Sequence, residues 1–189
     1  AKYLGITLFA NCMPSHKGIY HPNYDTMNPK PNSYWIENRK WSSDRIVDWV
    51  LNYLNHFKEK SNAHIEYLGI WNEPYYYTNQ LDMIEKTQAV RKALNENGYE
   101  YVKLVGPCEV NIEKTLKTLT PNGQALAQGV TRKQLSNLFD VISSHTQMQD
   151  TDGNYAGWLN LKDNYCFGKP LWNSEGKTLD YHNGDKCIH

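Results

Sequence analysis

Short apolar stretches alternate with longer amphipathic stretches along this chain of 189 residues. Strand-length runs rich in apolar and β-branched residues predict buried strands at residues 3–10, 64–71, 101–107, 138–145 and 169–175. Apolar side chains at helical spacing predict helices between them at residues 42–60, 79–98, 111–119 and 123–137. Residues 14–42 and 146–168 show neither pattern and are expected to be long loops.

Two of the helices carry recognisable end signals. Ser43 or Asp44 is the expected N-cap of the first helix, because both side chains can accept a hydrogen bond from a free backbone N–H. Asn79 is the expected N-cap of the second, and Gly98 is expected to end it. These signals agree with the periodicity and strengthen both assignments.

Strands that alternate with helices predict an α/β fold with a parallel sheet. A doubly wound sheet that binds a nucleotide needs a glycine-rich loop after a strand, and this sequence has none. Polar or ionisable residues instead follow several strand ends: Asn11, Asn72, Glu73, Glu109, Asn111, His145, Asn173 and Glu175. In a (β/α)8 TIM barrel all such strand ends meet on one face, where the active site lies. We therefore predict part of a (β/α)8 barrel.

Composition narrows the function classes further. Lysine plus arginine and aspartate plus glutamate both number 20, so the chain shows no basic excess of the kind that binds nucleic acid or a membrane surface. No run approaches the roughly 18 consecutive apolar residues of a membrane span. The 14 tyrosines, 6 tryptophans and many asparagines suit a sugar, which has apolar faces and a hydroxyl rim, although aromatic side chains also fill cores.

The four cysteines do not have the spacing of a metal site. Cys12, Cys108, Cys166 and Cys187 are far apart in the sequence, and no CxxC pair occurs. They could form disulfides or remain buried thiols. We expect no metal and no other cofactor.

Glu73 and Glu175 occupy equivalent places, each at the end of an aromatic-rich strand, in the strings "IWNEP" and "LWNSE". Glycoside hydrolysis needs two carboxyl groups at one centre, one to protonate the leaving oxygen and one to attack the anomeric carbon. Either glutamate alone could be a helix cap or part of an ion pair. The matched pair favours catalysis.

These strings also carry a resemblance to a known family. "YLGIWNEP" resembles the acid/base strand of retaining (β/α)8 glycosidases, and "LFDVISSH" followed by "GKPLWNSEGKTLDYHNGDKC" is similar to glycoside hydrolase family 59, the galactocerebrosidases, with family 30 second. The resemblance implies that Glu73 is the acid/base, that Glu175 is the nucleophile and that Asn72 binds the sugar 2-hydroxyl. It places His145 in the pocket. Three aromatic residues are further candidates for substrate contact: Trp71, Tyr75 and Trp172.

The resemblance implies a partial barrel. Residues 1–189 would be the central and C-terminal part of a glycosidase catalytic domain and supply about strands three to seven, with the other strands contributed by another chain or a segment outside this sequence. The expected function is a retaining β-glycosidase that acts on a β-galactoside such as a galactosylceramide-like glycolipid, in a secreted, lysosomal or otherwise lumenal location. The alternative is a catalytically silent barrel with a structural or carbohydrate-binding role. Both long loops are expected over the mouth of the barrel.

Overall fold

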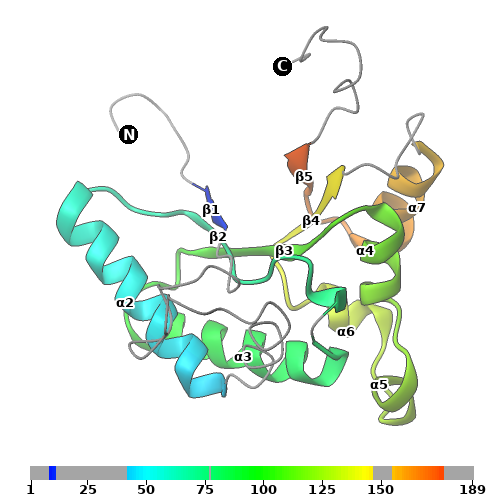
Figure 1. Ribbon diagram of the computed structural model, residues 1–189, viewed down its shortest axis with the longest axis horizontal. Coiled ribbons are helices and arrows are strands. Elements are labelled where there is room, and N and C mark those ends of the chain that lie inside the picture. Colours follow the sequence, from blue (N-terminus) through cyan, green and yellow to red (C-terminus); the bar gives the residue numbers. More distant parts are fainter. Residues whose placement is uncertain (1–8, 12–41, 77, 147–154, 177–189) are drawn as a thin grey trace, which may run out of the picture.

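The computed structural model describes residues 9–11, 42–76, 78–146 and 155–176 (Figure 1). Its sheet has five strands, β1 (Phe9–Asn11), β2 (Tyr67–Gly69), β3 (Lys103–Glu109), β4 (Val141–Thr146) and β5 (Leu171–Gly176). Each strand pairs in parallel with the next one in the sequence, so the spatial order is β1-β2-β3-β4-β5. A doubly wound sheet reverses its strand order at a switch point, whereas this order runs in one direction as in a barrel. The prediction of a partial (β/α)8 barrel is confirmed.

Helices form an arc around the outside of the curled sheet (Figure 1). They are α2 (Ser43–Ser61), α3 (Gln80–Glu96), α4 (Ile112–Leu119), α5 (Gly123–Ala127), α6 (Arg132–Ser136) and α7 (Tyr155–Tyr165), with a short 3-10 turn, η2 (Pro74–Tyr76), after β2. Together with the five strands they make a half-barrel. Among the described residues, β1 and β5 each have one edge without a neighbouring strand.

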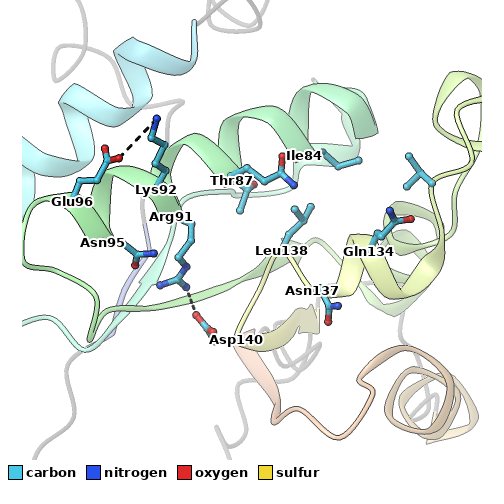
Figure 2. Close-up of a pocket in the computed structure, with 12 residues that line it drawn as sticks. Ile84, Thr87, Arg91, Lys92, Asn95, Glu96, Gln134, Asn137, Leu138 and Asp140 are labelled. Atoms are coloured by element: carbon cyan, nitrogen blue, oxygen red, sulfur yellow. Dashed lines mark hydrogen bonds and ion pairs between the residues drawn. The ribbon is translucent and has the colours of Figure 1, made fainter.

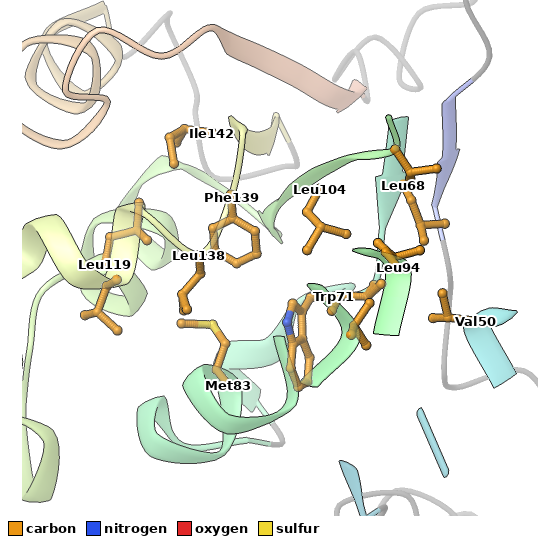
Figure 3. Packing of buried hydrophobic residues seen from close by; sticks show 14 of the residues in the cluster. Val50, Leu68, Trp71, Met83, Leu94, Leu104, Leu119, Leu138, Phe139 and Ile142 are labelled. Atoms are coloured by element: carbon orange, nitrogen blue, oxygen red, sulfur yellow. The ribbon is translucent and has the colours of Figure 1, made fainter. Parts of the chain in front are cut away.

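The sheet buries both of its faces. Alternate strand residues such as Leu68, Leu104 and Ile142 point outward and pack against the helices in the main core (Figure 3). A second, smaller cluster lies on the inner face and is built from Val105, Cys108 and Val141, with Phe9, Tyr67 and Trp172 packed against it. This alternation is what a strand between two layers requires, and it points every second side chain into the half-barrel.

The helix ends follow the predicted chemistry with one shift. Asn79 caps α3, accepting a hydrogen bond from the backbone N–H of Asp82 at 2.9 Å, and Gly98 just beyond the helix has a φ of 77°, which favours glycine. For α2 the predicted cap is wrong by one or two positions. Ser42 is the N-cap and accepts from the N–H of Arg45, so Ser43 and Asp44 fall within the first turn.

Two predicted elements differ most in extent. The helix expected at 123–137 is split into α5 and α6, because Gly129 adopts a φ of 72° and Thr131 then starts α6 with a capping box to Gln134. The strand expected at 64–71 is paired only over Tyr67–Gly69.

The prediction of a loop at 146–168 is wrong over α7. Gly157, Leu161 and Tyr165 recur every four residues and are buried, and α7 packs on α4 and α6 in the outer layer. This part of the segment therefore does not lie over the mouth. The other long loop predicted over the mouth, residues 14–42, lies outside the described residues except for Ser42.

Candidate active site

Three ionisable side chains meet at the carboxyl ends of the strands. Glu73 follows β2, His145 is near the end of β4, and Glu175 is near the end of β5, where it pairs with His145 across the sheet. The Nδ1 atom of His145 lies 3.6 Å from Oε1 of Glu73 and 3.8 Å from Oε2 of Glu175. The imidazole is fully buried, while the two glutamate side chains remain 29% and 34% exposed. The site therefore combines a buried histidine with two carboxylates that are partly exposed to solvent.

These distances limit how far apart the two carboxyl groups can be. Because both oxygens lie within 4 Å of one nitrogen, they cannot be farther apart than the two distances taken together. Carboxyl groups at opposite ends of the barrel are therefore excluded. The separation of about 5–5.5 Å that characterises retaining glycosidases lies within this limit and stays a prediction.

A bulge in β5 turns Glu175 toward the site. Ser144 pairs with Asn173 and His145 pairs with Glu175, so Ser174 is an extra residue in β5. The hydroxyl of Ser174 lies 3.3 Å from that of Ser143, on the inner side of the sheet. Strict alternation would then point Glu175 away from the interior, but the extra residue resets the alternation and brings its carboxylate to His145.

The backbone of Glu73 has an uncommon conformation. Its φ is 55°, in the left-handed region that L-residues seldom occupy. Its N–H donates to the carbonyl oxygen of Cys108 at 2.9 Å, which ties it to the end of β3. Cys108 itself has a φ of 57°. Such conformations cost of order 1–3 kcal/mol each and cluster at functional sites, so the neighbouring structure must hold Glu73 in place.

Glu109 is a third carboxyl of interest, which the sequence pattern places at a strand end without a role. It is fully buried, and its Oε1 accepts from the backbone N–H of Tyr75 at 2.8 Å and from Oγ1 of Thr118 at 2.5 Å. Burial, reinforced by the charge of Glu73, raises the pKa of Glu109 to about 8, although its two hydrogen bonds and Lys114 oppose the shift. Glu109 therefore carries a proton at neutral pH. A buried carboxyl beside a catalytic candidate is a signal that sequence spacing does not reveal.

Aromatic side chains next to Glu73 form an exposed surface at the mouth. Tyr75 and Tyr76 are 41% and 52% exposed and meet edge to face with their ring centres 5.6 Å apart. The Nζ atom of Lys114, on α4, lies 4.2 Å from the centre of the Tyr75 ring. Asn72 is half-buried directly before Glu73. The turn thus presents an amide, a carboxylate and two aromatic rings side by side in the sequence.

The two tryptophan candidates differ in where they lie. Trp172 is on the inner face, two residues before the bulge in β5. Its ring centre lies 4.7 Å from that of Tyr67 in a tilted arrangement, and it is edge-on to Phe9. Trp71 is 3% exposed in the outer core (Figure 3), and its Nε1 donates to Oγ1 of Thr87 on α3 at 2.9 Å. This placement departs from the expected substrate contact, because the indole is enclosed between the sheet and α3.

The other asparagines predicted at strand ends make different interactions from the residues of the Glu73–His145–Glu175 cluster. Asn111 caps α4 by accepting from the N–H of Lys114 at 3.0 Å. Asn173 is exposed and donates to Thr146 on the neighbouring strand. Both interactions are structural, and neither joins the Glu73–His145–Glu175 cluster. The side chain of Asn11 lies outside the described part of the chain.

A cavity of about 630 Å³ lies away from these groups, between α3 and the segment that runs from α6 into β4 (Figure 2). Arg91 and Asp140 form an ion pair on its wall, and Asp140 directly precedes β4. The carboxylate of Asp140 also accepts from the N–H of Leu104 at 2.7 Å. The cavity is therefore at the amino ends of the strands, the face of a barrel that serves stability more than catalysis.

Two of the four cysteines fall within the described residues. Cys108 and Cys166 are buried free thiols, and burial raises the pKa of each to about 11. Cys12 and Cys187 lie outside the described residues. None of the described helices is both long and apolar enough to span a bilayer.

Comparison with known proteins agrees with this geometry. Residues 31–189 match the profile described as "Glycosyl hydrolase family 59". The chain is 28% identical over 143 residues to "Galactocerebrosidase" of Macaca mulatta and to that of Homo sapiens. Each alignment covers 75% of this chain and 16% of the relative, so the chain spans about one sixth of the length of these proteins.

Proposed function

Because this chain belongs to glycosyl hydrolase family 59, we propose that it forms the catalytic half of a retaining β-glycosidase barrel, with Glu73 as the acid/base and Glu175 as the nucleophile. The observation that carries the proposal is the approach of both carboxylates to one buried histidine at the carboxyl ends of β2, β4 and β5. In a (β/α)8 enzyme this is the face that holds the active site.

The reaction would proceed by double displacement. Glu175 attacks the anomeric carbon and forms a covalent glycosyl-enzyme, while Glu73 gives its proton to the departing oxygen. Glu73 then removes a proton from water, which attacks the anomeric carbon and releases Glu175. The Nδ1 atom of His145 lies within 4 Å of an oxygen of each carboxylate but makes a hydrogen bond to neither, so the ring lies between the two groups. Asn72 would bind the 2-hydroxyl of the sugar.

We propose a β-galactoside as the substrate, with a galactosylceramide-like glycolipid as the natural form. The names of the relatives support this choice. The exposed rings of Tyr75 and Tyr76 follow Glu73, which must face the leaving group, so they offer an apolar surface where the aglycone would depart. Trp172 would contribute to the inner wall of the sugar site, whereas we assign Trp71 to the core.

The half-barrel also needs further polypeptide to close. An unpaired strand edge is a site for pairing with another chain, and among the described residues β1 and β5 each carry one. We propose that the remaining strands come from a segment beyond this sequence or from another chain.

A secreted, lysosomal or otherwise lumenal location stays a prediction, which the localisation of a tagged protein would test.

The central test compares Glu175→Gln and Glu73→Gln in the intact protein. Glu175→Gln should abolish turnover of all β-galactosides, because an amide cannot form the glycosyl-enzyme. Glu73→Gln should lower turnover of substrates with poor leaving groups by roughly 10²–10⁴-fold, the usual contribution of acid catalysis. It should spare the first step with an activated aryl galactoside, whose leaving group needs little protonation.

The wild-type protein and the Ser43→Ala variant, altered at a half-buried residue in the first turn of α2, are the matched controls. Full activity in both glutamate variants would refute the assignment. A wild-type protein that binds galactosides but turns over none would favour a silent, carbohydrate-binding barrel.

A further inference from the structure

The turn that carries Glu73 is held by two consecutive residues of β3. The carbonyl oxygen of Cys108 accepts from the N–H of Glu73 at 2.9 Å, and the carboxyl of Glu109 accepts from the N–H of Tyr75 at 2.8 Å. Two alternate backbone donors of the turn are thus tied to neighbouring acceptors. A φ of 55° at Glu73 needs such constraints to persist.

A bulge aims Glu109 at this turn. Pro107 pairs with Ser143 and Glu109 pairs with Ser144, so Cys108 is an extra residue in β3. The thiol of Cys108 points inward and lies 2.9 Å from the hydroxyl of Ser143. Glu109 points the other way, toward α4, where it meets Thr118 at 2.5 Å. The carboxyl therefore bridges the turn and α4.

The protonation of Glu109 suits this bridge. Its Oε1 accepts two hydrogen bonds, and its Oε2 is buried with no hydrogen-bond partner among the described residues, so a proton on Oε2 would disturb neither bond. The charged groups that act on it are Glu73 from the turn and Lys114 from α4. A neutral carboxyl can support the turn without placing a second negative charge beside Glu73.

We propose that Glu109 is a positioning residue that holds the Pro74–Tyr76 turn and thereby sets the direction of the Glu73 carboxyl. The proposal rests on the function proposed above, in which Glu73 protonates the leaving group. Loss of the Glu109 acceptor frees the N–H of Tyr75 and lets the turn relax from its strained conformation. The acid is then misplaced, while the nucleophile on β5 keeps its own support.

The variants Glu109→Met and Glu109→Gln in the intact protein separate this role from simple packing. Methionine fills a similar volume but accepts no comparable hydrogen bond, whereas the glutamine amide oxygen can replace Oε1. Thr115→Val is the matched control, because it removes the buried hydrogen bonds of the Thr115 hydroxyl to Asn111 and Ser144 but neither of the two bonds that hold the turn. Each variant is assayed with a galactoside that has a poor leaving group and with an activated aryl galactoside.

We expect Glu109→Met to lower kcat for the poor leaving group by about 10–100-fold, the range for a displaced catalytic group. The aryl galactoside should lose less than about threefold, and Glu109→Gln should restore most of the activity. If Glu109→Met does not fold, Glu109→Asp serves instead, because its shorter side chain cannot reach both donors. Equal loss with both substrates, or failure of glutamine to rescue, would overturn the proposal.

Hydrogen exchange gives a readout that does not depend on turnover. The backbone amide of Tyr75 should exchange faster in Glu109→Met than in the wild-type protein or in Thr115→Val, because its acceptor is gone. Unchanged exchange would overturn the positioning role whatever the kinetics show. If Tyr75 exchanges faster in Glu109→Met but the wild-type protein hydrolyses no glycoside, the proposed function is refuted and the support of the turn by Glu109 stands.

Discussion

Substitution of Thr87 by valine tests whether Trp71 belongs to the core or to the sugar site. Thr87 and Trp71 are 1% and 3% exposed, and the hydroxyl of Thr87 accepts the indole N–H at 2.9 Å. Valine has nearly the same shape, so the substitution opens no cavity and removes only the acceptor. A buried donor left without a partner costs about 1–3 kcal/mol, and this is the expected loss in the free energy of unfolding.

The assay pairs thermal unfolding with steady-state kinetics on one galactoside. For a domain of this size, each kcal/mol lowers Tm by about 2–4 °C, so the shift should be roughly 2–12 °C. Well below the unfolding temperature, KM should not change, because the indole faces α3 (Figure 3). Ser43→Ala, which removes an exposed hydrogen bond to Glu85, should change stability by less than about 0.5 kcal/mol. A raised KM with an unchanged Tm would refute the reasoning and place Trp71 against the substrate.

Two further predictions concern packing and pH. In Gly106→Ala the new Cβ would lie 2.4 Å from a ring carbon of the buried Phe139. The free energy of unfolding should therefore fall by about 1–3 kcal/mol. In a double mutant, Phe139→Leu should recover part of this loss. The raised pKa of Glu109, about 8 against an ordinary 4.5, means that the folded state keeps a proton that the unfolded state releases, so the free energy of unfolding should fall as pH rises from about 4.5 to 8. Glu109→Gln should remove this contribution to the pH dependence of the free energy of unfolding. If the stability curves of the wild-type protein and of Glu109→Gln stay parallel from about pH 4 to 9, a window that spans both pKa values, the assignment is contradicted.

Much of the architecture follows from patterns that a sequence displays directly. The parallel sheet follows from the alternation of strands and helices, and the choice of a barrel follows from the polar residues at the strand ends. Asn79 and Gly98 mark α3 by chemistry that depends only on local backbone geometry. The convergence of Glu73, His145 and Glu175 could be predicted because parallel strands bring their carboxyl ends to one face.

Other features depend on tertiary packing and give weak local signals. α7 is held by Leu161 and Tyr165 against α4 and α6, but its glycine and polar residues weaken the helical pattern. Trp71 lies beyond the paired part of β2, where alternation no longer determines which side a residue takes. Glu109 was expected only as a polar strand end, because neither its bridge to α4 nor its protonation can be seen without the fold.

The bulges at Cys108 and Ser174 make this barrel mouth tolerant of a change in residue number. Each bulge sets two consecutive residues against one partner residue, so the glutamate that follows keeps the side it would have if the extra residue were absent. Deletion of Ser174 would place Glu175 directly after Asn173, where regular alternation still directs it toward His145. A homologue that lacks one residue at either bulge can therefore keep the same arrangement of carboxyl groups, and a gap at that point of an alignment would mark a change of backbone and not the loss of the site.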